Sequence, residues 1–173
     1  MATDYERKIA KRFIDLWSKQ RRETYSIMDG ADPPDFLLDS QTQKTWLEVT
    51  DIYQNQAQGK FMNCSTERTY TFSGDPSKTA ENLINQLSRK LGNPNYRKVF
   101  EERGTGMLLL TCQDCVFDEV NLAHVDKGLL GFKPFEDQGF FNIAYFEYRL
   151  KDGRRFYDEI YPEQEIRTGG SAA

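Results

Sequence analysis

The chain has 173 residues, of which 38% are hydrophobic and 13% aromatic, and it carries a net charge of −4 at pH 7. This length and hydrophobic content predict one folded domain with its own core and exclude an intrinsically disordered chain. The acidic balance excludes a uniformly basic surface for nucleic acid but leaves room for a local basic track.

Residues 4–22 are predicted to form an amphipathic helix. Thr3 or Asp4 can cap its start, and Glu6 lies in the first turn, where a negative charge is favourable. Apolar side chains recur at helical spacing: Tyr5, Ile9, Phe13, Leu16 and Trp17. The outer face is basic, which is typical of a solvated face and compatible with a track for a phosphate backbone. Its basic residues are Lys8, Lys11, Arg12, Lys19, Arg21 and Arg22.

A short strand over residues 24–28 leads into two further strands that each carry one carboxylate, Asp35 and Glu48. Pro33 and Pro34 have no backbone N–H to donate, so the strand over 36–38 cannot begin before them. Residues 40–43 are a polar break at which the chain can reverse. In the strand that follows, alternation places Lys44, Trp46, Glu48 and Thr50 on one face.

The two acids lie in apolar surroundings and need a partner. A lone buried carboxylate is costly, and two carboxylates on neighbouring strands repel each other. A divalent cation answers both problems, and Mg²⁺ is typically held by one or two carboxylates. The alternative is structural: Asp35 caps a turn, and Glu48 pairs with an arginine or lysine at a sheet edge.

Pro34-Asp35, followed thirteen positions after the aspartate by Glu48-Val49-Thr50, resembles the signature of the PD-(D/E)xK (restriction-endonuclease-like) nuclease superfamily. The motif covers residues 33–50, and the element order extends the resemblance over residues 4–115. It implies that Asp35 and Glu48 hold Mg²⁺ or Mn²⁺, with the backbone carbonyl of Val49 as a further ligand. The lysine of the motif is replaced by Thr50, which can donate a hydrogen bond but carries no charge.

The resemblance also implies residues outside the hairpin. Relatives often place a further acid on the first helix, for which Glu6 is the candidate and Glu23 the rival. In some relatives a polar residue from the second helix substitutes for the strand lysine. Lys90 or Gln86 could do so here, and the alternative for Lys90 is a solvated side chain.

The rest of the chain supplies the elements that such a core needs. Residues 53–77 are polar, with a possible strand at 69–72, and fit either a substrate-facing flap or a plain insertion. Asp75 and Pro76 open the second helix, which ends before Gly92. Further elements are expected at 96–103 (helix), 107–112 (buried strand), 117–125 (helix), 140–150 and 155–161 (a hairpin).

The predicted fold is therefore α/β, a restriction-endonuclease-like core with a central mixed β-sheet flanked by helices in the order α-β-β-β-α-β, plus a C-terminal hairpin. We expect a single domain over residues 1–166 and a flexible tail over 167–173. The longest apolar run, at 107–110, is far too short to span a membrane, and the sequence start does not resemble a signal peptide. A cytoplasmic protein without a membrane partner is expected.

Three cysteines cannot all pair, which suits a reducing compartment. Cys112 and Cys115 form a C-x-x-C that, with Cys64 and His124, could bind zinc. Inert thiols at the end of a strand are the alternative.

The resemblance, together with the paired acids and the basic helix, implies a metal-dependent phosphodiesterase acting on nucleic acid, DNA in preference to RNA. A nuclease-like module that has lost its chemistry and binds nucleic acid or a protein partner is the second hypothesis. An α/β domain of unrelated fold, with an accidental motif, is the third.

Overall fold

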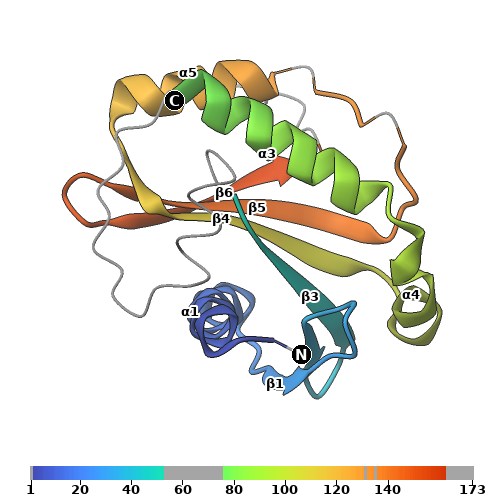
Figure 1. The fold of residues 1–173 in the computed structure, drawn as a ribbon. Helices are drawn as coiled ribbons and strands as arrows, with labels where there is room; N and C mark the ends of the chain where they lie inside the picture. Colours follow the sequence, from blue (N-terminus) through green and yellow to red (C-terminus); the bar gives the residue numbers. More distant parts are fainter. Residues whose placement is uncertain (1, 53–75, 131, 135, 163–173) are drawn as a thin grey trace, which may run out of the picture.

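The computed structural model describes residues 2–52, 76–130, 132–134 and 136–162, which form a six-stranded mixed β-sheet with helices on both faces (Figure 1). The strands are β1 (Ser26–Asp29), β2 (Phe36–Asp39), β3 (Lys44–Asp51), β4 (Gly106–Phe117), β5 (Phe141–Leu150) and β6 (Arg155–Tyr161). The helices are α1 (Asp4–Arg21), α3 (Pro76–Leu91), the short 3₁₀ helix η1 (Pro94–Tyr96), α4 (Arg97–Arg103) and α5 (Glu119–Leu129). The predicted α/β class, element order and C-terminal hairpin are confirmed.

The strands lie in the sheet in their sequence order. The pairs β1–β2, β2–β3 and β5–β6 are antiparallel, whereas β3–β4 and β4–β5 are parallel. Parallel neighbours need a crossover connection, and α3 with α4 serves the first pair while α5 serves the second. The parallel strands therefore lie in the middle of the sheet, where both faces are covered.

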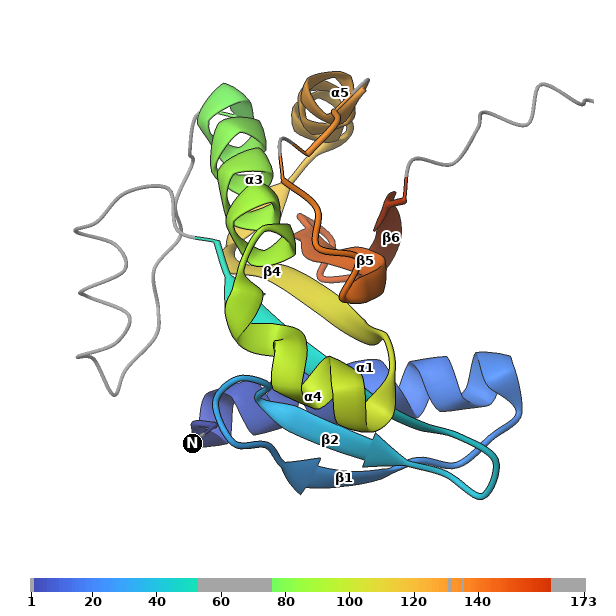
Figure 2. The same cartoon turned by 90° about the vertical axis from the view of Figure 1, so that its right-hand side faces the viewer.

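The two faces of the sheet belong to two hydrophobic clusters. Figure 1 shows α3 and α5 above the sheet and α1 below it, and Figure 2 shows the same layers from the side. Alternate residues of β3 divide between the clusters: Trp46 packs with Leu83 and Leu87 of α3, whereas Leu47 packs with Phe13 of α1. Glu48 and Thr50 follow Trp46 in the alternation and so belong to the α3 face.

Helix α1 begins as its sequence predicts, but its buried face differs in one position: Leu16 of the predicted apolar stripe is exposed, and Ile14 is buried instead. Thr3 is the N-cap, and with Glu6 it forms a capping box. Arg12 anchors the helix to the sheet, because its Nε donates to Glu147 Oε1 of β5 at 3.0 Å. Glu147 is fully buried and also accepts hydrogen bonds from Thr111 and Tyr157, both at 2.9 Å. Arg12 is thus part of an ion pair with a buried carboxylate as well as of the basic outer face of α1.

Several boundaries differ from the sequence-based prediction. β4 runs on to Phe117 because, past a register shift, its last residues pair with Arg149 and Leu150 of β5. Cys112 therefore lies within a strand and is buried in the core, so the prediction that the C-x-x-C ends a strand was wrong. α5 extends to Leu129, four residues beyond the prediction. The possible strand at 69–72, most of the 53–77 segment and the 167–173 tail lie outside the described residues.

Within the described part of the chain, no helix combines the length and the apolar character that crossing a bilayer requires.

Gly106 is required at the start of β4 by the indole of Trp46. A Cβ built on this glycine would lie 2.2 Å from Trp46 Cδ2. Gly106→Ala should therefore lower the free energy of unfolding by ~1–3 kcal/mol, the usual cost of overpacking a core. Urea unfolding of this variant beside Thr105→Ala, a change at the exposed preceding residue, measures the difference. An unchanged stability of Gly106→Ala would contradict the packing described here.

Candidate functional site

The β2–β3 hairpin brings Asp35 and Glu48 opposite each other. Phe36 pairs with Leu47 in the antiparallel register, and Asp35 is one position beyond this pair, across from Glu48. Asp35 Oδ2 accepts a hydrogen bond from the backbone N–H of Val49 at 2.9 Å. The strands that carry the two acids are thus adjacent, so the lack of adjacency that would have identified an accidental motif is not found.

The loop before β2 fixes the position of Asp35. The N–H of Gly30 donates to the carbonyl of Asp35 at 2.8 Å. A Cβ on Gly30 would lie 1.9 Å from the carbonyl oxygen of Pro34, so only glycine allows this approach. The segment before β2 therefore folds back on Pro34 and Asp35 and holds the carboxylate at the end of the strand.

Lys90 of α3 forms an ion pair with Glu48 through Nζ and Oε1. Both side chains are largely buried, with 15% of Lys90 and 6% of Glu48 exposed. Leu87 and Leu91, both fully buried, hold the last turns of α3 against the sheet and bring Lys90 over β3. The alternative of a solvated Lys90 was therefore wrong, whereas the structural alternative that Glu48 pairs with an arginine or lysine is confirmed.

Gln86 lies one helical turn before Lys90, on the same row of α3. Its side-chain oxygen accepts a hydrogen bond from Arg89 at 2.7 Å. Of the two candidates on this row, Lys90 is therefore the one that the structure brings to Glu48.

Two oxygens of β3 are buried without a hydrogen-bond partner among the described residues: Glu48 Oε2 and Thr50 Oγ1. They come from residues two apart on one strand, so they share a face of the sheet. Buried polar atoms nearly always have a partner, and each exception needs an explanation. Oxygen atoms of this kind are the ligands that Mg²⁺ prefers, so the donor set fits a hard divalent cation.

The electrostatics of the site are dominated by its two carboxylates. Burial, followed by the charge of Glu48, raises the pKa of Asp35 to about 7. The N–H of Val49 and the charge of Lys90 act in the opposite direction, and Glu6 adds to the rise. One ammonium group therefore leaves the pair of acids only partly compensated, which again suits a cation between them.

Tyr96 is a residue of this site that the sequence did not single out. It is 1% exposed, and its ring stacks on Trp46 with centroids 5.3 Å apart. Burial, and then the negative charge of Glu48, raises the pKa of its hydroxyl above the ordinary value. Only its aromatic character within a short helix was visible in the sequence, and this does not distinguish a site residue from a core residue.

Glu6, the acid of the first helix that was predicted as a further metal ligand, forms hydrogen bonds with the cap of its own helix. Glu6 Oε2 accepts hydrogen bonds from the N–H and the hydroxyl of Thr3, at 2.7 and 2.9 Å. Its charge still acts on Asp35. A role for Glu6 as a further metal ligand stays a prediction, as does the role of the Val49 carbonyl.

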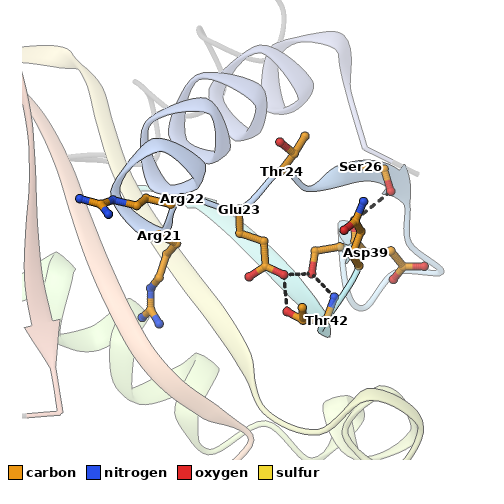
Figure 3. Close-up of a pocket in the computed structure, with 9 residues that line it drawn as sticks. Arg21, Arg22, Glu23, Thr24, Ser26, Asp39 and Thr42 are labelled. Carbon is orange, nitrogen blue, oxygen red and sulfur yellow. Dashed lines mark hydrogen bonds between the residues drawn. The ribbon is translucent and has the colours of Figure 1, made fainter.

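Glu23, the rival of Glu6, lies at the opposite end of the hairpin in a polar pocket of about 770 Å³ (Figure 3). Hydrogen bonds from Ser40 and then Thr42, both in the β2–β3 turn, lower the pKa of Glu23 to about 2. Tyr25 donates a further bond at 2.9 Å. These contacts fasten the α1–β1 connection to the turn, so we assign Glu23 a structural role.

The zinc hypothesis stays a prediction, because three of its four candidate ligands are not among the described side chains in which no group of three or more His, Cys, Asp or Glu is arranged to hold a metal. Cys64 and the side chains of Cys115 and His124 lie outside the described part. The candidate for a divalent cation is thus a site of two carboxylates, Asp35 and Glu48, completed by other oxygens.

Comparison with known proteins adds one distant likeness. No family model and no curated protein matches the chain. Among solved structures, SfsA of Pyrococcus furiosus in complex with Ca²⁺ is similar with a TM-score of 0.35 and 14% sequence identity. The alignment covers 88% of this chain and 62% of that one, so the chain spans less than two thirds of the length of SfsA.

Proposed function

We propose that this protein is a metal-dependent phosphodiesterase with a restriction-endonuclease-like core, acting on nucleic acid and on DNA in preference to RNA. The proposal rests on one observation: two strands and a helix bring Asp35, Glu48 and Lys90 together, and the second oxygen of Glu48 is buried without a described partner. Neither the active-site roles nor the substrate follows from the fold alone.

Mg²⁺ or Mn²⁺ would be held by the carboxylates of Asp35 and Glu48. The Val49 carbonyl would be a third ligand, and Glu6 is the candidate for a fourth. When bound, such an ion supplies Lewis-acid stabilisation of charge on the scissile phosphate and lowers the pKa of a bound water. The fit rests on Glu48 Oε2, which has no hydrogen-bond partner among the described residues, and on the raised pKa of Asp35.

The side chains of the chain itself would orient the substrate. The ammonium group of Lys90 can turn from Glu48 to a phosphate oxygen and supply the positive charge that Thr50 lacks. The hydroxyl of Thr50, which has no described partner, can donate a hydrogen bond in the same place. Gln86 remains the second candidate for the role of Lys90.

Cleavage of single-stranded and duplex DNA and RNA, with Mg²⁺ or Mn²⁺, tests the proposal. Asp35→Asn and Glu48→Gln should each lower the rate at least ~100-fold, the usual cost of losing one group that stabilises transition-state charge. Glu23→Gln, an acid at the other end of the same hairpin, should retain the wild-type rate. Wild-type cleavage by the Asp35→Asn/Glu48→Gln double variant would contradict the assignment.

A catalytically inactive module that binds nucleic acid or a protein partner is the alternative. The observation that favours it is the Lys90–Glu48 ion pair, which neutralises one acid without any metal. Calorimetric titration with Mn²⁺ separates the two: binding that Glu48→Gln abolishes supports the enzyme, and no binding supports the module.

A further inference from the structure

A second, aromatic pocket lies between the C-terminal half of α1 and the β5–β6 hairpin. Its volume is about 210 Å³, which exceeds the ~150 Å³ of an apolar cavity that takes up benzene. This volume is sufficient for one planar ring system. Most of its lining consists of rings and one guanidinium: Phe13, Trp17, Tyr145, Arg155, Phe156 and Tyr157.

The pocket includes a buried donor that is not satisfied. Trp17 is 6% exposed, and its Nε1 has no hydrogen-bond partner among the described residues. Trp46 behaves in the ordinary way, donating from Nε1 to the carbonyl of Gly104 at 2.9 Å. A buried tryptophan N–H usually finds an acceptor. Burial and then the charge of Glu159 raise the pKa of the Tyr145 hydroxyl, and an interaction with the Trp17 N–H that is too weak to count as a formed hydrogen bond lowers it.

Positive charge lies at the C-terminal end of α1, between this pocket and the one that contains Glu23. The guanidinium of Arg21 lies 5.3 Å from the centre of the Trp17 ring. Lys19 and Arg22 are exposed in the same last turn and its cap. Two acids lie on this side of the molecule: Glu159 of β6 is opposite Tyr145 in the strand register, and Glu147 lies 3.7 Å from the Arg155 guanidinium. Rings interleaved with cations suit a ligand that combines an aromatic base with a phosphate.

We propose that this pocket binds a nucleobase of single-stranded nucleic acid. The base stacks among the aromatic side chains and accepts a hydrogen bond from Trp17 Nε1, while its phosphate lies beside the arginines of α1. Single strands are favoured because the pocket takes one ring, whereas a duplex base is already stacked on both sides. A part in substrate recognition rests on the proposed function, but base binding itself requires neither Asp35 nor Glu48.

The two tryptophans of the chain provide a direct readout. In ¹H–¹⁵N spectra of the metal-free full chain, thymidine monophosphate and a short oligothymidylate should both shift the Trp17 indole signal saturably, leaving that of Trp46 in place. The oligonucleotide should bind more tightly, and deoxyribose 5-phosphate should shift neither signal. An unmoved Trp17 signal would overturn the proposal, as would an equal response to the sugar phosphate. Equal affinity for mononucleotide and oligonucleotide would overturn the assignment to a strand.

A pocket-filling variant tests the location. Gln20 is exposed and lines the pocket, so Gln20→Phe should fill it without unfolding the chain and weaken oligothymidylate binding at least roughly fivefold, as loss of one base stack does. Gln41→Phe makes the same exchange at an exposed position in the β2–β3 turn and should bind normally. Unchanged affinity in Gln20→Phe would refute the site. Glu48→Gln should lose cleavage but keep base binding, so each proposal can fail separately.

Discussion

Replacing Lys90 with methionine should lower the free energy of unfolding of the metal-free protein by ~3–5 kcal/mol, because it leaves a buried carboxylate without its cation. Glu48 is 6% exposed in the pair, and its second oxygen has no described partner. Methionine retains the apolar stem of lysine, so the loss reports the charge rather than the packing.

Urea unfolding in the presence of a chelator measures this effect. Glu48→Gln combined with Lys90→Met should recover most of the loss, since no unpaired charge remains buried. Arg89→Met, at the exposed neighbouring position of α3, should change stability little. Equal destabilisation by Arg89→Met and Lys90→Met would show that the ion pair with Glu48 does not contribute to the free energy of unfolding.

The stability of the metal-free protein should fall as the pH rises from about 4 to about 7, and Asp35 should cause a large part of the fall. An unfolded aspartate titrates near pH 4, whereas burial and the charge of Glu48 raise the pKa of folded Asp35 to about 7. Between these values the folded chain binds the proton more often than the unfolded chain, so stability declines until the folded pKa is passed. At about 1.4 kcal/mol for each unit of pKa, the decline approaches ~4 kcal/mol.

Asp35→Asn should remove this part of the pH dependence, since an amide still accepts from Val49 but does not ionise. Free energies of unfolding at about pH 5 and about pH 8, compared with those of the wild type, give the contribution. Asp32→Asn, an exposed position in the preceding turn, should retain the wild-type dependence. A dependence that persists in Asp35→Asn would show that the carboxyl is well solvated.

Local sequence signals were sufficient for most of the fold. Signals that act within a few residues predicted their elements closely. They are the capping residues and periodicity of α1, the Pro33-Pro34 boundary before β2, and the glycine after α3. The length of β4 was missed because its last residues are held by pairing with β5, more than thirty positions away. Such long-range pairing leaves no local mark in the sequence.

The candidate site, too, could be predicted from the sequence only in part. Asp35 lies opposite Glu48 because a hairpin register follows from its turn and its alternation, both visible in the sequence. The row through Gln86 and Lys90 was visible as well, but only the packing of α3 on β3 decides that Lys90 reaches Glu48. Two further features depend on contacts between segments that are distant in the sequence and so could not be predicted from it. They are the position of Tyr96 near Glu48 and the ion pair between Arg12 and Glu147.

A crystal structure of the protein soaked with Mn²⁺ tests most directly whether Asp35 and Glu48 share one cation. We expect an anomalous peak within coordination distance of both carboxylates, with the Lys90 ammonium group moved away from Glu48. Full occupancy of the Lys90–Glu48 ion pair at saturating Mn²⁺, with no peak between the two acids, would contradict it.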